Sequence, residues 1–216
     1  MNKLIGIFGG TFDPVHMGHV NAVNELHEEV KFERVHWVLS ARPPHKNQIS
    51  ASIRERFDML RLALSDYSRY YADDTEIKRQ EKSWTIDTVM EFEERFPGHP
   101  LALIIGGDSL LRIPTWHRAE ELVARINLIV MARPGYELKV PELLADHDQV
   151  PTDKIATTKA PTLTIFRQTD YPVSSTYIRE LLGQGGSHEP EEELQDLLPA
   201  AVIHYIQNEQ SYKIPS

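Results

Sequence analysis

Short apolar runs rich in β-branched residues alternate with helical patterns along this chain of 216 residues. The runs predict buried strands at residues 4–8, 35–39, 101–105, 126–131 and 163–166. Apolar residues at helical spacing predict amphipathic helices at 18–30, 52–64 and 84–96. Because strands that alternate with helices form parallel sheets covered on both faces, the sequence predicts an α/β fold with a doubly wound, mostly parallel sheet.

Polar, glycine-rich stretches follow the predicted strands. They cover residues 9–19, 40–46, 106–116 and 133–136. Open parallel sheets bind ligands beyond the carboxyl ends of their strands. These stretches are therefore expected to form a site along one edge of the sheet.

Length and composition narrow the class of protein. The length fits a single domain, residues 1–216, with an α/β core over about 1–170 and a C-terminal helical segment over about 171–216. The formal net charge of −9 disfavours non-specific binding to nucleic acid or to an anionic membrane, and no apolar run reaches membrane-spanning length. Without cysteine or a secretion signal, the chain is expected in the cytoplasm. The sequence leaves open whether it forms a homo-oligomer.

The most informative segment is the glycine turn after the first strand, which leads into a helix. Gly9 and Gly10 allow backbone N–H groups to approach a phosphate, and the start of the helix adds partial positive charge. His16 and His19 are three residues apart there, so both can face one anion. Two alternatives are a metal-binding pair, for which no third ligand is evident, and simple helix capping. The segment lacks the P-loop lysine and the dinucleotide-binding glycine pattern.

A second segment near the C-terminus combines hydroxyl groups with an arginine. Ser174, Ser175 and Thr176 precede a helical run, and Arg179 lies about one turn further on. A helix N-cap explains the hydroxyl groups alone, whereas the arginine beside them favours an anion site.

Three middle segments offer groups for a second substrate. His45 and Lys46 add positive charge after the second strand, although a solvated proline loop explains them equally well. Asp108 is placed to accept hydrogen bonds from ribose hydroxyls. Trp116 could stack on a flat ring, although tryptophan is more often a core residue.

Both signatures resemble a known superfamily. The segment at 9–19, GGTFDPVHMGH, is similar to the (H/T)xGH signature of nucleotidyltransferases, shared with cytidylyltransferases and, more distantly, class I aminoacyl-tRNA synthetases. The segment at 173–179, VSSTYIR, resembles the second ATP signature of adenylyltransferases, with Val173 in place of the usual isoleucine. With PPHK, SWT, GGDS, PTWH and RPGY between them, the chain resembles bacterial nicotinate-mononucleotide adenylyltransferases over about residues 3–182.

The resemblance implies a Rossmann-like nucleotidyltransferase fold and a role for each matching residue. The catalytic, charge-neutralising residues would be His16, His19, Lys46 and Arg179. ATP would contact Gly9, Gly10, Thr11, Phe12, His16, His19, Gly106, Ser174, Ser175, Thr176 and Arg179. The acceptor would contact His45, Lys46, Trp84, Thr85, Asp108, Trp116, His117 and Arg133, with Thr85 and Trp116 framing the pyridine ring and its carboxylate. Trp84 and His117 stand where relatives often carry tyrosine, which leaves the preference between acid and amide acceptors open.

The reaction implied is transfer of the adenylyl group of ATP to nicotinate mononucleotide, which gives deamido-NAD and pyrophosphate in NAD biosynthesis. Mg²⁺ is expected to bind through the substrate phosphates, without a cage of protein ligands. The alternatives are another acceptor, such as nicotinamide mononucleotide or phosphopantetheine, a non-catalytic nucleotide sensor, and a histidine-based metallohydrolase.

Overall fold

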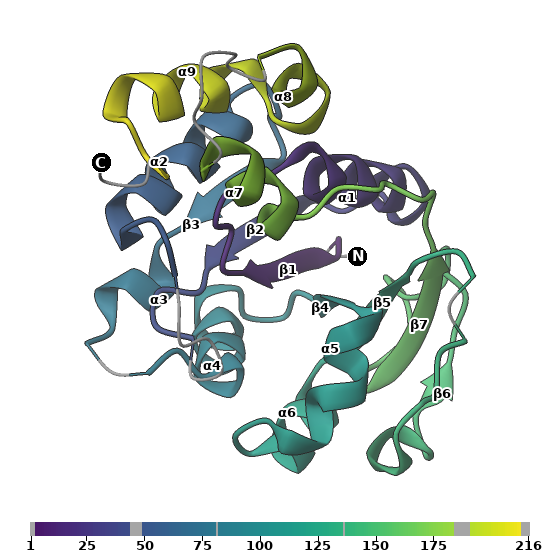
Figure 1. The fold of residues 1–216 in the computed structure, drawn as a ribbon. Coiled ribbons are helices and arrows are strands. Elements are labelled where there is room, and N and C mark those ends of the chain that lie inside the picture. Colours follow the sequence, from purple (N-terminus) through teal and green to yellow (C-terminus); the bar gives the residue numbers. More distant parts are fainter. Residues whose placement is uncertain (1–2, 44–48, 81, 136, 184–190, 213–216) are drawn as a thin grey trace.

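One parallel sheet organises the molecule (Figure 1). The computed structural model describes residues 3–43, 49–80, 82–135, 137–183 and 191–212. Seven strands lie in the order β3-β2-β1-β4-β5-β7-β6, and every neighbouring pair is parallel. The strands are β1 (Ile5–Gly10), β2 (Arg34–Leu39), β3 (Tyr70–Asp73), β4 (Leu101–Gly106), β5 (Asn127–Ala132), β6 (Asp148–Gln149) and β7 (Thr162–Arg167).

Helices cover both faces of the sheet, because successive side chains of a strand point to opposite faces. In β1, Leu4 and Phe8 belong to one buried apolar cluster, and Ile5 and Ile7 belong to the other. The first cluster includes side chains of α1 (Met17–Val30), α2 (Ile53–Ala63), α7 (Ser175–Gly183), α8 (Glu191–Leu197) and α9 (Ala200–Glu209). The second includes side chains of α4 (Thr85–Arg95), α5 (Gly107–Arg112) and α6 (Ala119–Arg125). Figure 1 shows these two groups of helices on opposite sides of the strands.

The strand order reverses between β1 and β4, which are hydrogen-bonded neighbours. The chain extends from β1 through β2 to β3 in one direction, and from β4 through β5 to β7 in the other. Such a reversal leaves a crevice at the carboxyl ends of the two central strands, where ligands bind in doubly wound folds. Gly10 and Gly106 are the last residues of β1 and β4.

The predicted doubly wound fold is confirmed, and each predicted strand and long helix is present within one or two residues. The sequence reading missed β3, the two-residue β6, α5, α6 and the short α3 (Thr75–Lys78). The proline-rich stretch 134–161, for which the sequence predicted no strand or helix, carries β6 and buries Leu144 and Ile155. Within the described residues, no helix has the length and apolar character needed to cross a bilayer.

Candidate active site

Two adjoining cavities open at the carboxyl ends of β1 and β4. Gly9, Gly10 and Gly106 line both of them. Their volumes are about 440 and about 430 Å³. Since they meet at the point where the strand order reverses, the pair can hold two substrates whose reacting groups face each other across the glycines.

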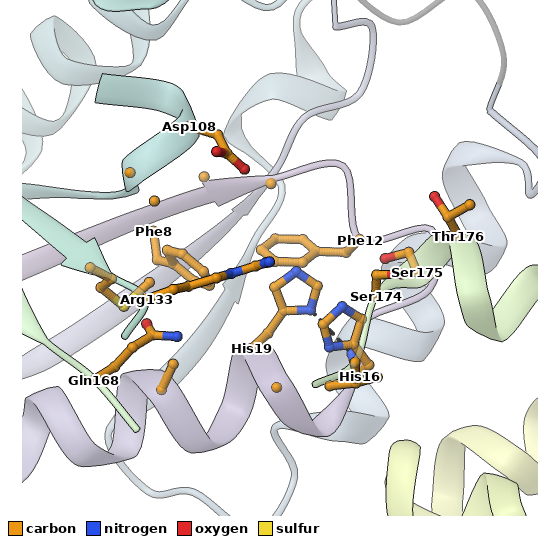
Figure 2. Close-up of a pocket in the computed structure, with 18 of the residues that line it drawn as sticks. Phe8, Phe12, His16, His19, Asp108, Arg133, Gln168, Ser174, Ser175 and Thr176 are labelled. Carbon is orange, nitrogen blue, oxygen red and sulfur yellow. Dashed lines mark hydrogen bonds between the residues drawn. The ribbon is translucent and has the colours of Figure 1, made fainter. Parts of the chain in front are cut away.

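The first cavity lies between the early histidine segment and the late hydroxyl segment (Figure 2). Figure 2 shows His16 and His19 next to Phe12, with Ser174, Ser175 and Thr176 on one side of them and Arg133 on the other. Residues 16 and 174 are thus far apart in the sequence but line one space. This arrangement was predicted from the sequence, and it makes the cavity suitable for one extended anion.

The two imidazole rings stack at the start of α1. Their centroids are 3.7 Å apart, with 28° between the ring planes. His16 is the N-cap residue of α1, and its backbone N–H donates to Nδ1 of His19 over 3.3 Å. Because Nδ1 of His19 accepts this bond, a neutral His19 carries its proton on Nε2, where it is a donor. The helix start therefore holds the His19 ring in one orientation.

His16 is neutral in the ligand-free protein. Its side chain is buried, and burial, followed by the positive charge of Arg133, lowers the pKa of His16 to about 3. Its Nδ1 is buried and has no hydrogen-bond partner among the described residues. The sequence suggested a cation at this position, whereas the structure gives a neutral imidazole, which can interact with an anion only by hydrogen bonding.

The late segment is fixed to the early one by direct contacts. Ser175 Oγ donates to the carbonyl oxygen of Pro14 over 2.9 Å, and Arg179 Nη1 donates to that of Asp13 over 2.7 Å. Ser174 caps α7, because its Oγ accepts from the backbone N–H of Tyr177 over 3.2 Å. The helix cap is therefore confirmed, and the anion site remains a prediction for hydroxyl groups that line the first cavity.

Close packing between the two segments requires a glycine in α1. A Cβ atom at Gly18 would lie 2.5 Å from Cγ1 of Val173 and 3.1 Å from Nδ1 of His16. Both distances are shorter than ordinary van der Waals contact. Gly18 thus allows α1 to approach the residues that precede α7, and the cavity between them to form.

Aromatic side chains line the second cavity. Trp84, Thr85, Trp116 and His117 lie in its wall. The rings of Trp84 and His117 are 4.7 Å apart with 31° between their planes, and Trp116 is half-buried. Trp84 is the N-cap of α4 and its side chain makes no cap hydrogen bond, and Thr85, the first residue of the helix, lines the cavity. A flat ring bearing an anionic group fits these features.

Glu76 is a buried carboxyl group in the same cavity, and the sequence reading did not identify it. Its side chain is 7% exposed, and Oε1 accepts from Thr88 Oγ1 over 2.9 Å. Oε2 has no hydrogen-bond partner among the described residues. Burial, the largest effect, raises the pKa of Glu76. Nothing in the local sequence separates it from an exposed helical glutamate.

The predicted site residues divide between the two cavities. The first is lined by Gly9, Gly10, Phe12, His16, His19, Gly106, Asp108, Arg133, Ser174, Ser175, Thr176 and Arg179. Asp108 and Arg133, expected beside the acceptor, thus lie with the histidines. Thr11, expected beside ATP, lines the second cavity. His45 and Lys46 lie outside the described residues.

Comparison with known proteins identifies the class. The profile of the cytidylyltransferase-like family matches residues 7–181. The chain is 35% identical to a probable nicotinate-nucleotide adenylyltransferase from Klebsiella pneumoniae, over 98% of each chain. It is 37% identical to a protein of the same name from Citrobacter koseri, over 99% of this chain and all of that one.

Solved structures share the fold. The nicotinic acid mononucleotide adenylyltransferase of Plasmodium falciparum, complexed with NaAD, superposes with a TM-score of 0.75 at 19% identity over 98% of both chains. A putative nicotinate-nucleotide adenylyltransferase from Vibrio parahaemolyticus gives a TM-score of 0.64 at 18% identity, over 97% of this chain and 95% of that one.

Fold, glycine-lined crevice and paired signatures together define a nucleotidyltransferase. The chain belongs to the cytidylyltransferase-like family, and the curated relatives that match it over their full length are named nicotinate-nucleotide adenylyltransferases.

Proposed function

We propose that this enzyme transfers the adenylyl group of ATP to nicotinate mononucleotide, releasing pyrophosphate and forming deamido-NAD. The observation that carries the proposal is the junction of the two cavities at Gly9, Gly10 and Gly106. ATP would occupy the first cavity and the mononucleotide the second, with the α-phosphorus and the acceptor phosphate meeting at the glycines. A location in the cytoplasm is part of the proposal.

The chemistry requires alignment of two anions more than it requires a strong base. The acceptor phosphate has a second pKa of about 6, so one of its oxygens is a ready nucleophile at neutral pH. That oxygen attacks the α-phosphorus in line, the bond to the β-phosphate oxygen breaks, and pyrophosphate leaves. No covalent intermediate with the protein is needed.

The side chains of the first cavity stabilise the leaving pyrophosphate. His16 and His19 would donate hydrogen bonds to the triphosphate from the start of α1. The hydroxyl groups of Ser174 and Thr176, with backbone N–H groups, would donate from the start of α7. Arg133 and Arg179 supply positive charge. Lys46, outside the described residues, remains a proposed partner of the phosphates.

Mg²⁺ fits this site as an ion bound by the nucleotide. Among the described residues, no cluster of three His, Cys, Asp or Glu side chains could hold a metal ion. Asp108 and Glu137 line the first cavity, and their carboxylates would be the residues to hold the hydrated ion there. When bound, Mg²⁺ neutralises charge on the phosphate oxygens.

In the second cavity, Trp116 would stack on the pyridine ring, and the start of α4 at Thr85 would receive its carboxylate. The flexible arm of phosphopantetheine has no flat ring for this aromatic wall. The same wall would also accept the amide form of the ring, so nicotinamide mononucleotide is the second candidate acceptor.

The test is product formation by the purified protein with ATP, Mg²⁺ and one of three acceptors. The acceptors are nicotinate mononucleotide, nicotinamide mononucleotide and phosphopantetheine. We expect the highest kcat/KM with nicotinate mononucleotide, and deamido-NAD as the product by mass spectrometry. Trp116→Ala should raise the KM for this acceptor by about tenfold, corresponding to the 1–3 kcal/mol of a lost stacking contact, while Trp116→Phe should retain most of the affinity. Dephospho-coenzyme A as the main product, or no pyrophosphate with any acceptor, would overturn the proposal.

A further inference from the structure

The C-terminal end of the described chain reaches back to the loop that carries the early histidines. Tyr212 Oη donates to Oδ1 of Asp13 over 3.0 Å. Asp13 is buried, with 4% of its surface exposed, and lies three residues before His16. The interaction joins residues separated by almost the whole length of the chain.

Asp13 connects several parts of the ATP site. Its carboxylate also accepts from the backbone N–H groups of Ser50 and Ala51, over 2.8 and 3.1 Å. These residues closely follow the segment that contains His45 and Lys46. Its carbonyl oxygen accepts from Arg179, whose Nη1 also lies 3.9 Å from Oδ2. The early loop, the late signature and the backbone at residues 50–51 therefore meet at one residue.

Arg56 balances the buried charge at this junction. Its side chain is 1% exposed and donates to the carbonyl oxygens of Thr11, Ser40, Ala41 and Ala51 over 2.9–3.2 Å. Both buried groups have hydrogen-bond partners, so the loss of one donor would leave a buried charge less well compensated.

The backbone turns sharply to bring Tyr212 to this position. Gln210, which ends α9, has φ 54°, and Tyr212 has φ 69°. Left-handed conformations are costly for residues other than glycine and persist only where surrounding contacts hold them. Ser211, between them, donates to Glu55 of α2 over 2.7 Å. The chain therefore adopts two unfavourable conformations where it delivers one hydroxyl group to Asp13.

We propose that Tyr212 is a positioning residue of the ATP site, acting through Asp13 on the His16 loop and Arg179. Its hydroxyl supplies a donor to the carboxylate that sets the distance between the two ATP signatures. Without it, Asp13 would turn toward its remaining donors, and Arg179 and the histidine loop would no longer be held in register. This inference rests on the proposed function only for the identity of the nucleotide.

The experiment compares Tyr212→Phe with a matched control in the full-length enzyme. The control, Tyr205→Phe, removes a tyrosine hydroxyl that contacts Asp58 over 3.4 Å. Affinity for a non-hydrolysable ATP analogue is measured by calorimetry, and steady-state KM values are measured for ATP and for nicotinate mononucleotide.

We expect Tyr212→Phe to weaken binding of the analogue and to raise the KM for ATP by about tenfold, close to the lower limit for one hydrogen bond to a charged group. The KM for the acceptor should change less than twofold, and Tyr205→Phe should bind the analogue normally. Equal losses in both variants, or unchanged binding by Tyr212→Phe, would overturn the proposal. Calorimetry needs no acceptor, so a wrong acceptor assignment would not affect this result.

Discussion

The imidazole rings of His16 and His19 stack face to face, 3.7 Å apart, at the first turn of α1. Two protonated rings at this distance would repel each other, and burial keeps His16 neutral. The pair therefore presents hydrogen-bond donors in a fixed orientation, and the arginines supply the charge. These separate roles, hydrogen bonding for the histidines and positive charge for the arginines, lead to several predictions.

The first concerns the protonation of His16. Because the pKa of His16 in the folded protein is about 3, below its ordinary value of 6.5, the unfolded chain binds a proton that the folded protein excludes. The contribution of neutral His16 to the free energy of unfolding should be complete above about pH 6.5 and should decline as the pH falls from there toward 3. We expect the His16 imidazole, followed by NMR in the ligand-free protein, to titrate below pH 4. A midpoint near 6 would contradict this account.

The second concerns His19 as the donor to the developing charge. His19→Ala should lower kcat by about a hundredfold or more, the usual effect of removing one donor to a transition state, and should change the KM for ATP much less. His204→Ala, an exposed histidine on α9, is the matched control and should behave as wild type. Near-normal turnover by His19→Ala would remove His19 from the catalytic set.

The third concerns Gly18 and Val173, which allow the two signatures to approach each other. Gly18→Ala places a methyl group 2.5 Å from Val173 Cγ1 and should raise the KM for ATP by about tenfold, consistent with the 1–3 kcal/mol of an overpacked contact. Adding Val173→Ala should recover part of the loss, because the closest clashing atom is removed. Failure of any recovery in the double variant would mean that the contact with His16, at 3.1 Å, dominates.

The fourth concerns the buried carboxyl group of Glu76. Burial raises the pKa of Glu76, so the folded protein favours the protonated form. Protonated Glu76 should therefore stabilise the folded state fully at pH values below its pKa in the unfolded chain, about 4.3. This stabilisation should be lost as the pH rises through its pKa in the folded protein. Glu76→Gln keeps an acceptor for Thr88 and carries no charge.

The stability of Glu76→Gln relative to wild type should therefore increase as the pH rises from 4 to 8. Denaturant unfolding at several pH values measures this difference. Glu91→Gln, which alters an exposed partner of Arg79, should show a much weaker dependence on pH. A constant difference for Glu76→Gln across the range would show that Glu76 is not perturbed by burial.

Sequence periodicity predicted the central strands and the long helices because these bury regular apolar patterns. It missed β3 because this edge strand has only four residues, with Tyr71 exposed and Ala72 partly so. It missed α5 and α6 because both are short. In addition, α5 begins with a glycine immediately after β4, and α6 follows a segment that contains Pro114. Elements of this length depend on contacts with the rest of the fold.

Only part of the candidate site could be predicted from the sequence, because only some of its residues stand in local sequence patterns. His16, His19 and Arg179 stand in recognisable local patterns, and the structure brings them to one cavity. Arg56 could not be singled out, because Arg54 and Arg61 occur in the same amphipathic helix and only the fold buries Arg56. Likewise, the contact between Tyr212 and Asp13 spans nearly the whole chain, and no local pattern encodes it.

The central claim is that two distant segments bind one triphosphate. A crystal structure of the enzyme with a non-hydrolysable ATP analogue and Mg²⁺ tests it most directly. We predict phosphate oxygens within hydrogen-bond distance of His16 or His19 on one side and of the Ser174–Arg179 segment on the other. A triphosphate held by only one of these segments, or located in the cavity of Trp84 and Trp116, would contradict the account.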